Sequence, residues 1–260
     1  MILRRRPALN GVWLDEVDER IVISGINEPP AADNIAAQDL AGICGQRVTE
    51  QRRATKDVEI RFRIWLTKNQ MAEREAVLEK VVSWAAPGGY LTLGHKPGRR
   101  LRVILAQAPT PADIYNWTDE YTVTFRAYTV PFWEDETALT ATSGIGASGY
   151  VQLQVPGNTE TPVDVRVQNM SGAAISTVEL TVAGQNMKFS GLGLGGSSEL
   201  ILDHVDTGTN YYFRARIGST SVLQKRTGAD EFIVKPGAIL SAFGASRAVR
   251  VTLSVRGRYL

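Results

Sequence analysis

The chain is poor in the residues on which most catalytic and disulfide-bonded sites depend. It has one cysteine, Cys44, in 260 residues, so no intrachain disulfide can form, as is usual for a protein made in a reducing cytosol. A cysteine nucleophile needs a base, and the only histidines are His95 and His204. We therefore interpret Cys44 as a small residue in the turn Gly42-Ile43-Cys44-Gly45.

Long apolar runs and an excess of one charge are also missing. No segment approaches the ~20 apolar residues of a membrane span, and the basic segment 1–7 lacks the apolar stretch of a signal peptide. Lys and Arg number 29 against 27 Asp and Glu. The basic clusters Arg4 to Arg6 and Arg99-Arg100 come without a nucleic-acid-binding signature, so we interpret them as surface or interface charge. We expect neither a membrane nor a specific nucleic-acid partner.

One segment changes from a strand period to a helix period. Apolar and polar residues alternate from Val58 to Leu66, which indicates a strand with one buried face. Thr67 and Gln70 then have the spacing of a capping box, and a helical apolar stripe ends before Pro87-Gly88-Gly89. The residues of that stripe are Met71, Leu78, Val81, Val82 and Ala85. The sequence thus predicts one long amphipathic helix in a chain that is otherwise mainly β.

Composition changes once, near residue 140, and this indicates two domains. All five tryptophans precede it (Trp13, Trp65, Trp84, Trp117 and Trp133), and residues 140–149 are small, polar and rich in glycine. We expect an N-terminal α+β domain at 1–138, split-barrel-like with the helix against it, a linker at 139–149, and a C-terminal β-sandwich at 150–260. Residues 27–51 show no sustained period and predict a long loop or an extended arm.

Further strands follow from short apolar runs between turn residues. In the first domain they are Ile21 to Ile26, Tyr90 to Leu93, Leu101 to Leu105 and Tyr121 to Ala127. In the second they are Tyr150 to Val155, Val163 to Val167, Val178 to Val182, Met187 to Phe189, Glu199 to Asp203, Tyr211 to Ile217, Phe232 to Val234 and Val249 to Val255.

Three local motifs could carry chemistry, and we interpret each as structural. Gly191 to Gly196 lacks the Lys-Ser/Thr and the helix of a phosphate loop, which favours a hairpin connection. In Asp203-His204-Val205-Asp206 neighbouring side chains alternate between faces, so we expect a strand end and no metal site. Glu134-Asp135-Glu136 is typical of a solvated acidic patch. We predict no catalytic residue, no cofactor and no metal.

The order of elements resembles a known family. The alternating strand at Glu59 to Trp65, the helix ending at Trp84 and the strand ending in Phe125-Arg-Ala-Tyr128 lead to Pro131-Phe132-Trp133. Val163 to Asn169, Leu202 to Thr207 and the closing strand continue the match. This order is similar to the distal tail proteins (Dit) of long-tailed phages, and the resemblance covers the whole chain.

The resemblance implies a structural protein of the virion tail tip, assembled in the host cytoplasm. It implies a homohexameric ring, a galectin-like second domain, and contacts with the tail tube protein, the tail-associated hub protein and, in many phages, receptor-binding proteins. From the residues themselves, the outward side chains Glu59, Arg61, Arg63 and Trp65 are our candidate subunit interface, because a large aromatic stands beside alternating charges.

Two other classes remain open. A carbohydrate-binding module or glycan-active accessory protein would fit the second half, although that half has no tryptophan and only Tyr212 of Tyr211-Tyr212-Phe213 is expected to face outward. The other alternative is a different adaptor, such as a baseplate or tube-completion protein of a contractile phage or a phage-derived particle.

Overall fold

The chain forms two compact units. The computed structural model describes residues 6–39, 46–67, 72–113 and 120–260. The first unit is Met1–Trp133 together with Leu260, and the second is Glu134–Tyr259. Both are built mainly of strands, as expected, and no helix in the described ranges is long and apolar enough to cross a bilayer. Cys44 lies outside the described residues.

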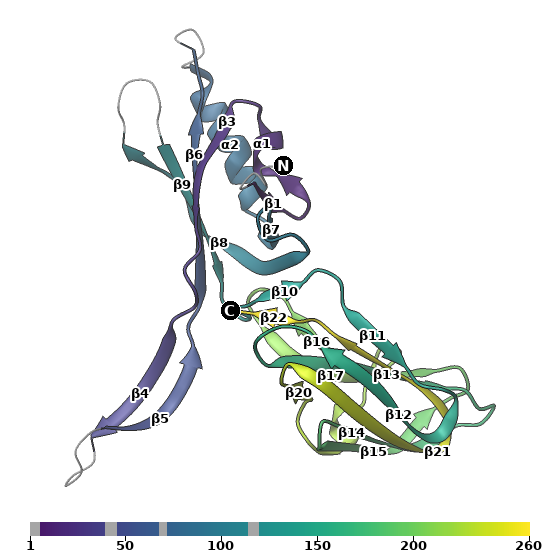
Figure 1. Cartoon of the computed structure of the whole chain (residues 1–260). Helices are drawn as coiled ribbons and strands as arrows, with labels where there is room; N and C mark the ends of the chain where they lie inside the picture. Colours follow the sequence, from purple (N-terminus) through teal and green to yellow (C-terminus); the bar gives the residue numbers. More distant parts are fainter. Residues whose placement is uncertain (1–5, 40–45, 68–71, 114–119) are drawn as a thin grey trace. The chain divides into compact units, whose positions relative to one another are not determined.

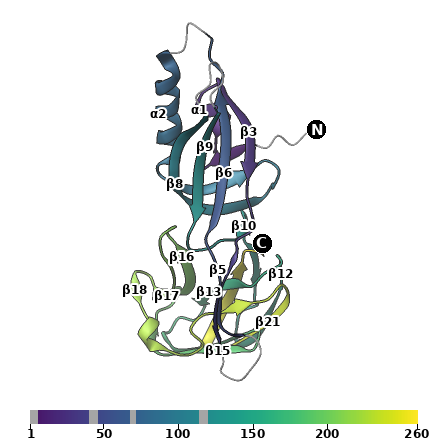
Figure 2. The ribbon, with the colours of Figure 1, turned by 90° about the vertical axis from the view of Figure 1, so that its left-hand side faces the viewer.

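Most strands of the first unit form one curled antiparallel sheet (Figures 1 and 2). In spatial order they are β2 (Val12–Trp13), β1 (Pro7–Leu9), β7 (Gly89–Leu93), β8 (Arg99–Asp113), β9 (Glu120–Ala127), β6 (Lys56–Ile64) and β3 (Ile21–Asn27). The described helices of this unit are α1 (Leu14–Val17) and α2 (Arg74–Ala85).

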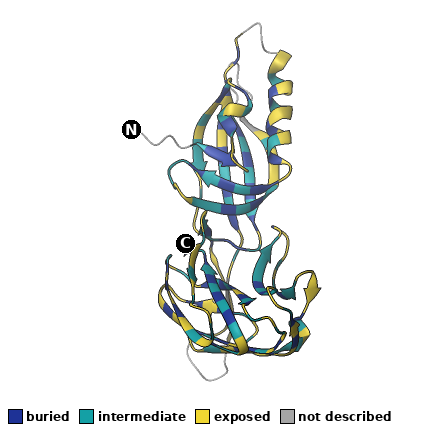
Figure 3. Ribbon diagram, turned by 90° about the vertical axis from the view of Figure 1, so that its right-hand side faces the viewer, coloured by how far each residue is buried: buried dark blue, intermediate teal, exposed yellow. Residues whose placement is uncertain are grey.

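The strand period decides which face of the sheet is buried. On β6 the side chains of Val58, Ile60 and Phe62 are buried, whereas the alternate residues lie on the other face. Helix α2 packs against the buried face, where the rings of Trp84 and Phe125 meet edge to face with centroids 5.7 Å apart. Figure 3 shows the exposed and buried stripes of the helix.

The buried stripe of α2 agrees in part with the predicted one. Val81 and Ala85 are buried as predicted, and Val77, one turn earlier, is buried with them. Leu78 is half-buried and Val82 is exposed, because each lies ~100° around the helix from a buried neighbour. Met71 lies outside the described residues.

The predicted end of the helix is confirmed, whereas the predicted capping box is not tested. Helix α2 begins at Arg74, and its N-cap Glu73 makes no side-chain cap hydrogen bond. Gln70, the second residue of the predicted box, lies outside the described residues. After the C-cap Ala86, Gly88 and Gly89 have φ of 59° and 137°, a region that disfavours side chains and ends the helix.

The predicted loop or arm at residues 27–51 contains regular structure. Strands β4 (Asp33–Asp39) and β5 (Gln46–Arg53) pair antiparallel with each other and with no other described strand, as a hairpin that continues β3 and β6 (Figure 1). We call residues 33–53 the arm. Of the two predicted alternatives, the hairpin fits the extended arm and not the loop. Its strands were not predicted because few of its residues are apolar, so the strand period is faint.

In the second unit, one long strand connects the two layers around the core. Residues 237–245 of β21 (Gly237–Val255) pair with β12 and β14, whereas residues 249–255 pair with β11 and β13. The other strands are β11 (Leu139–Thr142), β12 (Gly146–Val155), β13 (Thr161–Asn169), β14 (Ile175–Val182), β15 (Gln185–Leu194), β16 (Glu199–Asp206), β17 (Tyr211–Ile217), β18 (Thr220–Ser221), β19 (Arg226–Gly228), β20 (Ile233–Val234) and β22 (Arg258–Tyr259). A short 3-10 turn, η2, spans Leu223–Lys225.

The linker expected at 139–149 is wrong. Its first residues form β11, which pairs with Thr252 to Val255 of β21, and its last residues begin β12. Both β11 and β12 pair with β21, so residues 139–149 belong to the second unit, which starts at Glu134. Small polar residues mimic a linker here because these strands bury few side chains.

Candidate functional site: exposed faces of the two units

The four residues predicted as a subunit interface lie on one surface. Glu59, Arg61 and Arg63 alternate along β6 and point away from the core, and Trp65 follows directly after the strand. Trp65 is 65% exposed although its backbone N–H donates to the Arg20 carbonyl at 2.8 Å. We call this surface the outer sheet face. A solvated indole held by an ordered backbone is typical of residues that dominate protein interfaces.

Charges on the outer sheet face are paired with neighbours across the strands. Arg63 lies 3.9 Å from Glu120 on β9, and Asn27 on β3 donates to Glu59 at 3.1 Å. The guanidinium of Arg126 makes two bonds to Asp57, at 2.6 and 2.7 Å, which raises the pKa of the arginine. These cross-strand pairs orient the side chains and offer a partner both signs of charge.

The arm carries a second exposed apolar surface. Ala37 pairs with Val48, and Ile35 lies two residues earlier on the same strand, so the three share one face of the hairpin. Ile35 and Val48 are 57% and 55% exposed. An isolated two-stranded hairpin is marginally stable in water, so the arm has both the surface and the need for a contact outside itself.

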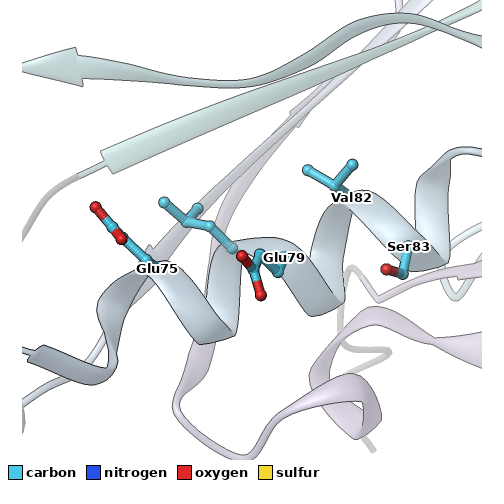
Figure 4. A pocket seen from close by; sticks show the side chains of 5 residues that line it. Glu75, Glu79, Val82 and Ser83 are labelled. Carbon is cyan, nitrogen blue, oxygen red and sulfur yellow. The ribbon is translucent and has the colours of Figure 1, made fainter.

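Helix α2 presents a mixed acidic and apolar surface, which includes Leu78 and Val82, two residues that the sequence predicts to face the core. Glu75, Leu78, Glu79, Val82 and Ser83 line a shallow hollow of about 530 Å³ along the helix (Figure 4). Every described lining residue comes from this one helix, so the hollow holds no convergent polar groups that could orient a small ligand.

The acidic motif at Glu134 to Glu136 is a solvated patch only at Glu136, which is exposed, whereas Glu134 and Asp135 are half-buried. Glu134 forms an ion pair with Arg258 at 2.9 Å, and Asp135 accepts a hydrogen bond from the backbone of Gly257 at 3.1 Å. These carboxylates bind the C-terminal segment to β10 (Trp133–Asp135), so their role in the structure is to hold the chain end in place.

The glycine-rich motif is a strand end and a crossing connection, not the expected hairpin. Strand β15 runs to Leu194 and pairs with β14 and β19, whereas the following strand β16 pairs with β13 and β17. The carbonyls of Leu194 and Gly195 accept hydrogen bonds from the Asn169 side chain. A phosphate would instead require converging backbone N–H groups.

The Asp203-His204 motif reveals a group that sequence reasoning missed. His204 Nδ1 is 2.9 Å from Asp164, and Nε2 is 3.0 Å from Glu231. Asp203 points to the other face and pairs with Arg214. Among the residues that the structure describes, no group of three His, Cys, Asp or Glu is arranged to hold a metal ion.

The side chain of His204 is 4% exposed and lies parallel to the Tyr211 ring at 5.7 Å. Burial raises the pKa of Tyr211 to about 12, so its hydroxyl stays protonated while it contacts Arg258 at 3.2 Å. The cluster therefore consists of fixed donors and acceptors, and we find no activated nucleophile in it.

Comparisons with known proteins give a match in structure only. No protein-family model and no curated protein sequence matches the chain. The crystal structure of SPP1 Dit, described as a paradigm of the hub adsorption apparatus in phages that infect Gram-positive bacteria, matches with a TM-score of 0.72. The match has 13% identity and covers 98% of this chain and 99% of that one. A chain of the phage p2 baseplate in its activated conformation matches with a TM-score of 0.44 at 7% identity, covering 91% of this chain and 90% of that one. The resemblance to Dit proteins is thus confirmed at the level of the fold.

Proposed function

We propose that the chain is a structural protein of a phage tail tip and that it assembles as a closed ring of six identical copies. The observation that carries the proposal is the match to a Dit hub protein over nearly the full length of both chains, because the two units occur together and in the same order. The second unit then corresponds to the galectin-like domain. Fold similarity alone does not establish function, so the proposal depends also on what the surfaces of this chain are able to bind.

Two surfaces of the first unit fit contacts between copies. The outer sheet face offers the exposed indole of Trp65 beside paired charges of both signs, which suits an aromatic anchor with a polar rim. The arm offers the apolar side chains Ile35 and Val48. Contact with the next copy would supply the packing partner that an isolated two-stranded hairpin lacks. A contact between two different surfaces can repeat around a ring, which closes when the rotation per copy divides the full circle.

The remaining partners follow from a position at the tail tip. The ring would join the tail tube protein on one side and the tail-associated hub protein on the other, and the second unit would present receptor-binding proteins. No enzymatic step is part of this role. The tail tube and hub contacts require the ring, so ring formation is the first property to test.

The test compares matched surface variants of the full chain by size-exclusion chromatography with light scattering. Trp65→Ala should shift the ring toward monomer by at least about tenfold, because interface hot spots contribute ~2 kcal/mol or more. Tyr150→Ala is the matched control, since Tyr150 is an equally exposed aromatic on the second unit. Equal mass distributions for the two variants would contradict the assignment of the outer sheet face.

The arm is tested by replacing it with a short turn. The Ala54 N–H donates to the Ala32 carbonyl at 2.8 Å, so the ends left by removing residues 33–53 are already adjacent and an Asn-Gly turn can join them. We expect a folded monomer, with unchanged tryptophan fluorescence and no rings. Rings that persist in this variant would exclude the arm from the contact.

A further inference from the structure

The second unit has a polar cleft on its outer surface. It has a volume of about 420 Å³, within the ~300 to 1,000 Å³ usual for small-ligand clefts. Its polar lining comes from β11, β13, β16 and β21, where outward side chains lie opposite one another in the sheet register. We call it the polar cleft, with Thr140, Asp164, Arg166, Asp203, Thr252 and Ser254 as its polar side chains.

The charges in the polar cleft nearly balance. Asp203 is neutralised by two bonds from Arg214, at 2.5 and 2.6 Å. Arg166 is exposed in the centre of the cleft, between Ile201 and Thr252 in the register. Within the described residues it makes no hydrogen bond or ion pair, so its donors are available to a ligand.

The carboxylate of Asp164 is held in position by His204. Its Oδ1 atom accepts a hydrogen bond from the backbone N–H of His204 at 3.0 Å and contacts the ring Nδ1 at 2.9 Å. His204 is itself fixed by Glu231 and by stacking on Tyr211. Asp164 remains 43% exposed, so its second oxygen can accept a hydrogen bond without reorganisation.

We propose that the polar cleft binds a neutral saccharide unit. Each sugar hydroxyl both donates and accepts, which matches a fixed carboxylate, an unpaired guanidinium and the hydroxyls of Thr252 and Ser254. Tyr212 is 47% exposed on the same face, two residues from Arg214, where its ring can cover an apolar sugar face. The site is additional to the proposed ring contacts and does not depend on them.

Other ligand classes fit this lining less well. The exposed carboxylate of Asp164 opposes a phosphate or another strong anion. The apolar lining residues are Ile201 and the fully buried Leu202, which are too few for the apolar core of a protein interface. A metal ion would need three converging ligands. Asp203 is instead paired with Arg214, and Asp164 contacts the ring of His204.

The test is saturation-transfer NMR on the full chain, with glucose, galactose, N-acetylglucosamine and rhamnose as probes and with glucuronate and inorganic phosphate as anionic probes. We expect at least one neutral sugar to bind with a dissociation constant of about 1 mM, a free energy of ~4 kcal/mol. Arg166→Ala should weaken it at least about tenfold and Asp164→Asn about threefold. Arg247→Ala is the matched control, an exposed arginine of the same unit outside the cleft, and should leave binding unchanged.

Circular dichroism melts test whether a variant loses binding because it is less stable. We expect all three variants to unfold at the same midpoint temperature as the wild type. The proposal is overturned if no neutral sugar gives saturation transfer, if Arg166→Ala and Arg247→Ala bind alike, or if only glucuronate and phosphate bind.

Discussion

Replacing the buried residue Asn169 should destabilise the second unit and leave the stability of the first unit unchanged. Its side chain is 1% exposed at the end of β13. The Nδ2 group donates to the carbonyls of Ala173, Leu194 and Gly195 at 2.8, 2.8 and 3.0 Å. The Oδ1 atom accepts from the backbone N–H and the hydroxyl of Ser171, each at 2.8 Å.

The cost of changing Asn169 follows from these five contacts. In Asn169→Asp an acceptor replaces the donor that faces three carbonyls, so buried oxygens repel one another, and we expect a loss of about 3 to 5 kcal/mol. Asn169→Ala removes the same bonds without adding a charge, and we expect about 2 to 3 kcal/mol. At acidic pH the introduced carboxyl group becomes protonated and regains one donor, so the gap between the two variants should narrow.

The assay uses the uneven distribution of tryptophan. All five tryptophans lie at or before Trp133, so their fluorescence in urea reports the first unit, whereas far-UV circular dichroism reports both. We expect Asn169→Asp to shift only the dichroism transition. Gln168→Glu, the same kind of change one residue earlier on the outer face, should cost less than about 0.5 kcal/mol. A cost of Asn169→Asp within about 1 kcal/mol of that control would refute the reasoning.

Three further predictions concern the first unit and the domain boundary. Hydrogen bonds from Arg20 and Lys80 lower the pKa of Asp18, so Asp18→Asn should lower the free energy of unfolding by about 2 kcal/mol above pH ~4. This loss should shrink as the pH falls toward the folded-state pKa of Asp18, which urea titrations at several pH values can measure. Gly89→Ala should lower the melting temperature by roughly 10 °C or more, because an added Cβ would lie 2.0 Å from the Asn10 side chain at a φ of 137°. Residues 134–260 should unfold cooperatively alone, whereas residues 150–260 should not, since they lack β11; equal dichroism melts would contradict this.

The strands of the first unit could be predicted because their sequence period matches their burial. Strand β6 has a buried residue at nearly every second position, so its core and its outer sheet face both follow from alternation. The end of α2 could be predicted as well, because Gly88 and Gly89 adopt the positive φ that ends the helix after Ala86.

The polar cleft could not be predicted from the sequence for a different reason. Asp164, His204 and Glu231 come from widely separated parts of the chain, and only strand pairing brings them together. The sequence places His204 in a strand end because its neighbours in the chain face the opposite way. Local patterns place a side chain on a face but do not reveal what lies across the sheet.

The most direct test of the proposed function is negative-stain electron microscopy of the purified full chain, with two-dimensional averages of single particles. We predict closed rings with six-fold symmetry, the assembly that the resemblance to Dit proteins implies. A contact between two different surfaces of the same chain can either close into a ring or propagate into a filament, so the images decide between the two. Monomers alone at every concentration tested, or open filaments in place of rings, would contradict the proposal.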